Sequence, residues 1–181
     1  MSDQRPEYER LITPIEDRMI RSVWRIVNDP DEAEDAFQEA LLTIWRRWDA
    51  LGRHPNPHAL ILRICVNSAY DALRRRARRL RRLEAGAMRE EIPDSSPSAM
   101  QLVSIAEQRA QLLRAVGSLS RNQAKAFLMH AVEEIPYDDI AAAMNCREAT
   151  VRKPVARARA RLRALLSHLI PPVREEEGSH A

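Results

Sequence analysis

The chain contains little glycine, cysteine and aromatic residue. Its 181 residues include four glycines and two cysteines, and Phe, Trp and Tyr together make up 4%. Alanine, leucine, arginine and glutamate are common instead, and these residues favour helices over strands. Cys65 and Cys146 lie far apart, each within a helical pattern, which is not the disulfide framework of a small secreted protein. The composition therefore predicts an all-α protein with reduced cysteines.

Long apolar runs are also missing. No stretch approaches the ~20 residues that span a bilayer, and the N-terminus lacks the basic-then-apolar order of a signal peptide. The sequence has no glycine-rich phosphate loop, no serine or cysteine paired with histidine in a known catalytic order, and no metal-ligand spacing. We therefore expect a cytoplasmic protein that is not an enzyme and uses no metal or cofactor.

Charge is segregated along the chain although the net charge is only +3. Acidic residues crowd positions 29–39, whereas arginines crowd positions 74–82 and 147–163. Where the charge lies matters more than its sum for choosing a partner. The sequence thus predicts one acidic docking face and two basic surfaces.

Apolar spacing and turn residues divide the chain into two small helical domains. The predicted helices of the first cover residues 8–27, 30–48 and 58–82, with a Pro-rich loop at 52–57; those of the second begin near residue 101 and include 121–133, 137–144 and 148–168. The predicted boundaries are 8–83 for the first domain, 84–100 for a flexible linker, 101–170 for the second domain and 171–181 for a disordered tail.

Two patterns indicate surfaces of opposite charge. Asp31, Glu34, Asp35 and Gln38 share one helical face, opposite Phe37. Spacing alone leaves a docking face and plain solvation equally open. The seven arginines of residues 74–82 continue a helix whose exposed face is predicted to carry Arg63, Asn67 and Tyr70. That face suits phosphates and unstacked bases, although a solvated helix end is the alternative.

The last two predicted helices have the layout of a helix-turn-helix. Asn145 supplies a residue able to adopt the left-handed conformation of the turn, and residues 148–153 open the helix that would enter the major groove. A short helical hairpin without a DNA role is the alternative. Pro154 lies inside the second helix, where it removes a hydrogen bond and crowds the Thr150 carbonyl. The sequence therefore predicts either a bend at Pro154 or a later helix start.

These segments together resemble the extracytoplasmic-function (ECF) sigma factors. Residues 31–40, DEAEDAFQEA, are similar to the D-A-E-D-x-x-Q-E segment of that family, 58–67 to R-A-W-L-x-R-I-A-x-N, and 71–75 to D-x-x-R-R. In the second half, residues 119–123 resemble L-P-x-x-Q, 137–141 resemble S/Y-x-E-I-A, and 150–159 resemble T-V-K-S-R-L-x-R-A-R. The order and spacing of these motifs extend over nearly the whole chain.

The resemblance implies two domains, called regions 2 and 4, that bind core RNA polymerase (the β′ clamp and the β flap) and promoter DNA. It assigns polymerase binding to Asp31, Glu34, Asp35, Gln38 and Glu39. The predicted minus-10 residues are Arg53, Asn56, His58, Arg63, Asn67, Tyr70, Arg74 and Arg75, and the predicted minus-35 residues are Arg147, Glu148, Thr150, Arg152, Lys153 and Arg157. It further implies a linker that threads toward the RNA exit channel, and regulation by an anti-sigma factor.

The sequence departs from the family pattern at three places. Leu60 replaces a common tryptophan, Ser120 replaces proline, and Lys153-Pro154-Val155 replaces S-R-L on the recognition helix. The first two changes suit a core position and a helix cap. The third predicts an unusual minus-35 preference or a weaker dependence on that element.

Two other classes of function are also compatible with the sequence. A helix-turn-helix regulator would bind DNA without engaging polymerase, and would not need the acidic face. A helical interaction protein would use its arginines to bind acidic proteins, without the steep salt dependence of phosphate contacts.

Overall fold

The computed structural model describes residues 5–86 and 97–168, and all of its regular structure in these ranges is helical. The first range contains α1 (Arg5–Leu11), a 3-10 turn η1 (Thr13–Ile15), α2 (Glu16–Val27), α3 (Pro30–Arg46), α4 (Trp48–Gly52) and α5 (Pro57–Gly86). The second contains α6 (Pro97–Gly117), α7 (Arg121–Ala131), α8 (Tyr137–Met144) and α9 (Glu148–Leu166). The predicted all-α class is confirmed.

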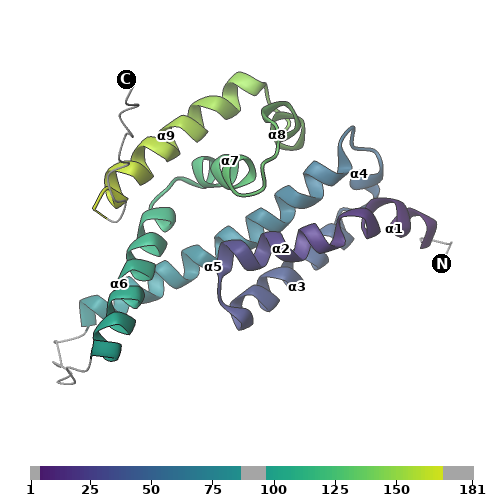
Figure 1. Cartoon of the computed structure of the whole chain (residues 1–181). Coiled ribbons are helices and arrows are strands. Elements are labelled where there is room, and N and C mark those ends of the chain that lie inside the picture. Colours follow the sequence, from purple (N-terminus) through teal and green to yellow (C-terminus); the bar gives the residue numbers. More distant parts are fainter. Residues whose placement is uncertain (1–4, 87–96, 169–181) are drawn as a thin grey trace, which may run out of the picture.

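In the N-terminal domain, α2 and α3 pack against each other and against α5 (Figure 1). Small alanines of α3 let the helices approach closely, and larger side chains such as Met19 and Ile61 fill the space between them. The single helix predicted over residues 8–27 is wrong. Pro14 lacks the amide proton that a continuous helix needs, so the chain forms η1 there and begins α2 at Glu16.

The helix ends follow the capping residues seen in the sequence. Asn28 adopts the left-handed conformation that ends α2, and the Asp29 carboxylate accepts a hydrogen bond from the Glu32 amide at 3.2 Å to begin α3. Asn56 caps α5 in the same way, through its Oδ1 and the Ala59 amide at 3.0 Å. α3 ends at Arg46 and not at the predicted Trp48, which begins α4 instead.

The C-terminal domain contains the predicted helix-turn-helix. Ser120 and Gln123 form a reciprocal capping box at the start of α7. Asn145, with a φ of 50°, makes the turn between α8 and α9. Of the apolar stripe predicted on α9, four residues are buried: Val151, Val155, Ala158 and Leu162. Leu165 is exposed, and Leu169 lies outside the described residues.

The helices that flank the predicted linker are longer than expected. α5 continues to Gly86 and α6 begins at Pro97, so both ends of the predicted 84–100 linker are helical. Residues 87–96 lie outside the described part of the chain, as does the predicted tail from 171 onward. Ile105 is apolar but 61% exposed, because the buried residues of α6 lie in its C-terminal part.

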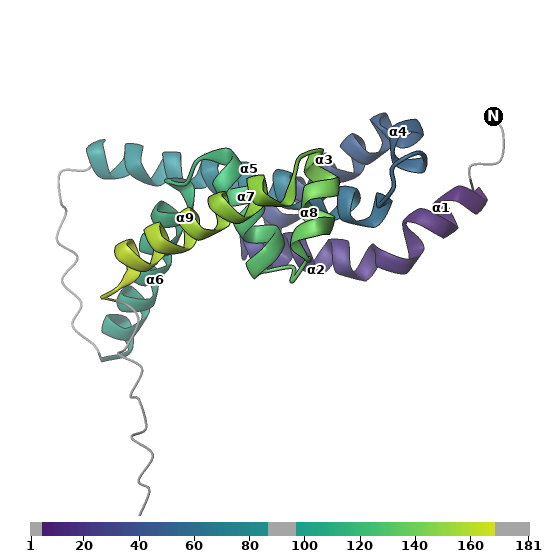
Figure 2. The ribbon, with the colours of Figure 1, turned by 90° about the horizontal axis from the view of Figure 1, so that it is seen from above.

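The two domains pack against each other along α5. This helix contacts α2 and α3 of its own domain and α6, α7 and α8 of the other (Figures 1 and 2). Several polar contacts join the domains: Arg18 donates to the Glu133 carbonyl and lies 3.8 Å from its buried carboxylate, and Arg121 pairs with Asp71 at 2.9 Å. The described protein is therefore closed, with its helix-turn-helix domain resting on the N-terminal domain.

α9 continues through Pro154 without ending. The helix starts at Glu148, where the sequence placed it, so the later start considered for it is wrong. Proline at this position leaves the Thr150 carbonyl without its helical partner.

We expect Pro154→Ala to raise the free energy of unfolding by about 1–3 kcal/mol, because alanine restores that hydrogen bond. Urea denaturation measures the change. Pro30→Ala is the matched control, since a proline in the first turn of α3 costs no hydrogen bond and its replacement should change stability by less than about 0.5 kcal/mol. Equal effects of the two substitutions would contradict the cost assigned to Pro154.

Candidate polymerase and promoter interfaces

The acidic side chains of α3 form a solvent-exposed stripe. Its members are exposed, as predicted: Asp31, Glu34, Asp35, Gln38 and Glu39. Gln38 donates a hydrogen bond to Glu34 at 3.0 Å, one helical turn away. The opposite side of α3 packs against α2 and α5. The stripe is thus a surface that no other described element covers, which suits a docking face.

Two large apolar side chains extend this stripe, and the sequence reasoning missed them. Leu42 is 54% exposed and Trp45 is 60% exposed. Asp35, Gln38, Leu42 and Trp45 follow one another at steps of three and four residues, which places them on one helical face. The spacing was visible in the sequence, because Leu42 and Trp45 lie one and two turns beyond Gln38 on the same side of the helix. We refer to the five polar residues with Leu42 and Trp45 as the α3 stripe.

The arginines of α5 have partners that the sequence did not suggest. Arg75 lies 3.3 Å from Glu39, Arg76 lies 3.2 Å from Asp29, and Arg79 pairs with Glu32. These arginines have acidic partners because α3 runs beside α5 and supplies the carboxylates. Glu39 and Arg75, which the sequence assigned to different surfaces, contact each other.

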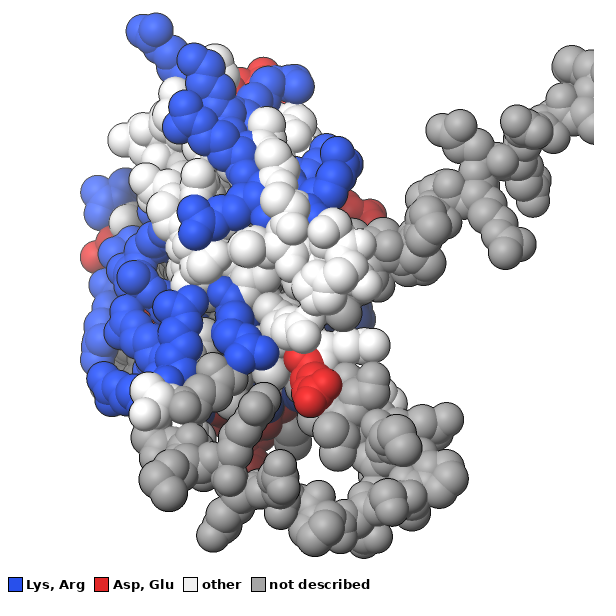
Figure 3. Space-filling model, turned by 90° about the vertical axis from the view of Figure 1, so that its left-hand side faces the viewer, with Lys and Arg blue, Asp and Glu red and all other residues white. Residues whose placement is uncertain are grey.

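Beyond these pairs, the C-terminal parts of α5 and α9 remain strongly basic. Arg78, Arg81 and Arg82 of α5 are exposed, as are Arg159 and Arg163 of α9. Figure 3 shows the end of the molecule where these helix ends lie, and Lys and Arg cover much of this view with few acidic side chains between them. Two basic helices thus form one surface in the closed protein.

Part of the predicted minus-10 surface is covered by the C-terminal domain. Asn56 donates to the Asp139 carboxylate at 2.5 Å, and Arg63 donates to the Ala143 carbonyl. Burial and the nearby Arg47 lower the pKa of Arg63. Arg53 is exposed and His58 is half-buried in the same region. In the closed protein, α8 therefore covers the part of this loop that carries Asn56 and the neighbouring Arg63.

Tyr70 does not lie on an exposed face, and that prediction is wrong. Its side chain is 0% exposed, and its hydroxyl donates to the Leu119 carbonyl at 2.8 Å. Burial raises the pKa of this phenol. The sequence pattern placed Tyr70 opposite the core of its own domain, which is correct, but the other domain covers that side.

Asn67 lines an open groove between α3 and α5. The groove has a volume of about 340 Å³, and its lining includes Leu42, Arg46, Arg47 and Asp71, all from the N-terminal domain. The Oδ1 atom of Asn67 is buried and has no hydrogen-bond partner among the described residues. A buried acceptor without a partner is costly, so the Asn67 amide has a hydrogen bond still to make at this groove. Arg74, another predicted minus-10 residue, is half-buried nearby on α5.

The predicted minus-35 residues lie at the start of α9 and are accessible in the closed protein. Arg147, Thr150, Arg152, Lys153 and Arg157 are exposed, and Glu148 is half-buried. Arg152 pairs with Glu148 at 2.5 Å, and its guanidinium lies 4.5 Å from the centre of the Tyr137 ring. The packing of α8 against the N-terminal domain thus leaves the start of α9 accessible.

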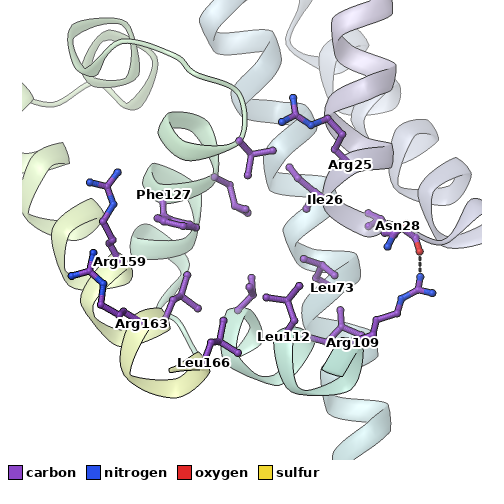
Figure 4. Close-up of a pocket in the computed structure, with 16 residues that line it drawn as sticks. Arg25, Ile26, Asn28, Leu73, Arg109, Leu112, Phe127, Arg159, Arg163 and Leu166 are labelled. Carbon is purple, nitrogen blue, oxygen red and sulfur yellow. Dashed lines mark hydrogen bonds between the residues drawn. The ribbon is translucent and has the colours of Figure 1, made fainter. Parts of the chain in front are cut away.

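A second cavity lies between the two domains and is apolar with a basic edge (Figure 4). Its volume is about 470 Å³, and it is lined from both sides by residues such as Ile26, Leu73, Leu112 and Phe127. Four arginines lie at its edge: Arg25, Arg109, Arg159 and Arg163. Arg109 also donates to the Asn28 carbonyl and so joins α6 to the end of α2.

The described residues contain no group of three or more His, Cys, Asp and Glu side chains that could hold a metal ion. Within the same ranges no helix is long and apolar enough to cross a membrane. Both cysteines are free thiols, and burial raises the pKa of Cys65 to about 12.

The fold and these surfaces define a DNA-binding transcription factor with two helical domains. Family models give the same division: sigma-70 region 2 matches residues 11–79, and sigma-70, region 4 matches residues 109–162. The RNA polymerase sigma-E factor of Streptomyces avermitilis is 30% identical over 159 residues, which cover 87% of this chain and 83% of that protein. The ECF RNA polymerase sigma-E factor of Escherichia coli is 27% identical, over 84% and 82% of the two chains. The chain belongs to the sigma-70 family, in its ECF group.

A solved structure shares the fold. The sigma factor RpoE from Bartonella quintana, crystallised in complex with the anti-sigma factor NepR, aligns with a TM-score of 0.52 at 22% identity. The match covers 89% of this chain and 97% of that one.

We expect Tyr70→Phe to lower the free energy of unfolding by about 1–2 kcal/mol, because the buried Leu119 carbonyl loses its donor. Arg121→Ala breaks the exposed pair with Asp71 between the same domains and should cost less than about 1 kcal/mol. Urea denaturation of both variants tests the difference. If the Phe variant is as stable as the original protein, the interdomain hydrogen bond of Tyr70 is not formed in solution.

Proposed function

We propose that this sigma factor docks on core RNA polymerase through the α3 stripe and directs promoter-specific initiation. The observation that carries the proposal is the exposed stripe itself, which passes from acidic residues to Leu42 and Trp45 on one helical face. A basic partner would be attracted by the acidic half, and tryptophan is a frequent anchor in interfaces. Heptad spacing matches a partner that is itself a helix or coiled coil, such as the β′ clamp helices. A regulator that only binds DNA does not require such a surface.

In the proposed complex, promoter DNA contacts both domains. The groove at Asn67 would receive an unstacked base of the minus-10 element, with the unpaired Oδ1 as its acceptor. The exposed residues at the start of α9 would read the minus-35 element in the major groove. The unusual minus-35 preference expected from Lys153 and Pro154 stays a prediction. In this proposal the protein acts by binding rather than by catalysis, and it would act in the cytoplasm, where polymerase and promoter DNA are found.

The closed arrangement adds a requirement for promoter capture. Asn56 and Arg63, both proposed minus-10 residues, are hydrogen-bonded to α8, so the two domains must separate before this loop meets DNA. The exposed polar contacts between the domains exchange at modest cost, whereas separation also exposes the apolar side of α5 that α7 and α8 cover. Binding to polymerase would then favour the open form by engaging the domains separately.

The interdomain cavity is the place where an anti-sigma factor would fit. It is apolar within and edged by arginines, which suits a helix that carries apolar and acidic residues. A segment bound there would contact both domains at once and stabilise the closed form. The structural relative from Bartonella quintana, itself solved with an anti-sigma factor, agrees with this kind of regulation.

The docking proposal is tested by run-off transcription with sigma-free bacterial core polymerase on a genomic fragment library. We expect specific start sites with the unaltered protein and at least a tenfold loss with Asp31→Lys combined with Asp35→Lys, because the reversed charges repel a basic partner. Both residues are exposed, so the fold should persist. Asp17→Lys with Asp49→Lys is the control, since it makes the same charge change outside α3.

Specific DNA binding by the unaltered protein without any run-off product would instead identify a regulator that does not engage polymerase. Equal losses with the α3 and control variants would show a general effect of charge and contradict the docking face.

The covering of the minus-10 loop is tested by binding of the free protein to single-stranded DNA from the minus-10 region of the mapped promoters. Asp139→Ala removes the acceptor for Asn56 and should tighten binding by about three- to tenfold, because the open form becomes more populated. Asp138→Ala changes an exposed neighbour on α8 and should have little effect. Fluorescence anisotropy measures both. Equal affinities of the two variants would mean that α8 does not restrict access to the loop.

A further inference from the structure

A stack of three side chains connects the three helices of the C-terminal domain that form the DNA-reading unit. Tyr137 is the first residue of α8, and its ring lies 4.0 Å from the ring of His130 on α7, with an angle of 28° between the rings. The Arg152 guanidinium of α9 lies 4.5 Å from the centre of the same Tyr137 ring. Tyr137 thus contacts both neighbouring helices through its ring.

Arg152 is held from a second direction as well. Its Nε donates to the Glu148 carboxylate at 2.7 Å, one helical turn back along α9. Its side chain nevertheless stays 61% exposed, so the ring and the carboxylate direct the guanidinium without enclosing it. Arginine has many rotamers, and a long side chain left free at the groove would lose that freedom on binding DNA. A guanidinium whose orientation is already fixed in the free protein loses less conformational entropy on binding.

The ring is itself kept in place. His130 Nδ1 lies 3.2 Å from the Ile135 carbonyl, in the loop that leads to α8, and Tyr137 is half-buried. The position of the Arg152 guanidinium therefore depends on the packing of α7 and α8, and not only on α9. Nothing in this chain of contacts involves the minus-10 surface or the α3 stripe.

We propose that Tyr137 is a positioning residue that sets the base preference of Arg152 in the minus-35 element, and that the base so selected is a guanine. Guanine follows from the chemistry of a directed guanidinium, whose paired donors match the O6 and N7 acceptors in the major groove. The inference rests on the proposed reading of duplex DNA by α9. It differs from a simple packing role for Tyr137, because packing alone would not single out one base pair.

The test uses the full-length protein and random-sequence duplex DNA. The unaltered protein first selects its preferred duplexes. Binding is then measured on the best duplex and on variants of it with single base-pair substitutions. Arg152→Ala should abolish the preference for guanine at one position. We expect Tyr137→Leu to lower the preference at that same position by about two- to fivefold, the worth of an exposed cation–π contact. Tyr137→Phe keeps the ring and should keep the preference.

The double variant Tyr137→Leu, Arg152→Ala should then show no further loss at that position, because the two residues act through one contact. A Tyr137→Leu protein that weakens binding to every duplex equally would overturn the inference and leave a packing role. An unaltered protein that selects no duplex would overturn the proposed reading of the minus-35 element, and this inference with it.

A second measurement does not depend on the folding of the leucine variant. In the free protein, the aromatic ring current of Tyr137 should shift the NMR signals of the Arg152 side chain upfield, and the shift should persist in Tyr137→Phe. Arg152→Lys assigns the signals by their disappearance. Unshifted Arg152 signals in the unaltered protein would overturn the inference whatever the DNA measurements show.

Discussion

The structure depends on α5 being buried on more than one side. Ile61, Leu62, Ile64, Cys65 and Val66 are all buried, although they point in different directions around the helix. A helix that is apolar over most of its circumference needs neighbours on each side. α2 and α3 cover one side, and α7 and α8 cover another. The closed arrangement of the domains is the consequence, and Tyr70 lies at the point where the second domain meets the helix.

Two of the ion pairs between helices are exposed to solvent. Glu39 with Arg75 and Asp71 with Arg121 are exposed pairs, and such pairs contribute ~0–1 kcal/mol each. Arginines that pair weakly with acids in the free protein lose little when they exchange those acids for phosphates. The contacts between the domains combine exposed polar pairs with buried apolar packing along α5 and the apolar cavity edged by arginines.

Much of the fold could be predicted because its signals are local. Asn28, Asp29 and Asn145 specify helix ends by their own backbone preferences, and the Ser120–Gln123 box does so by reciprocal hydrogen bonds. The spacing of Val151, Val155 and Ala158 fixed the buried side of α9. The break at Pro14 was missed, since the apolar spacing continues across it while the missing amide proton ends the helix.

The candidate surfaces also include features that the sequence determines and features that only the tertiary structure determines. The sequence by itself determined the helices, their caps, the helix-turn-helix and the exposure of the acidic residues of α3, because each follows from interactions within a few residues. The tertiary structure alone decided that Tyr70 is buried, that Asn56 and Arg63 are held by α8, that Trp45 is exposed, and that Arg75 meets Glu39. These properties depend on which distant segment packs against a given helix face. The local sequence pattern of a face is the same whether that face is exposed to solvent, buried in the core or part of an interface.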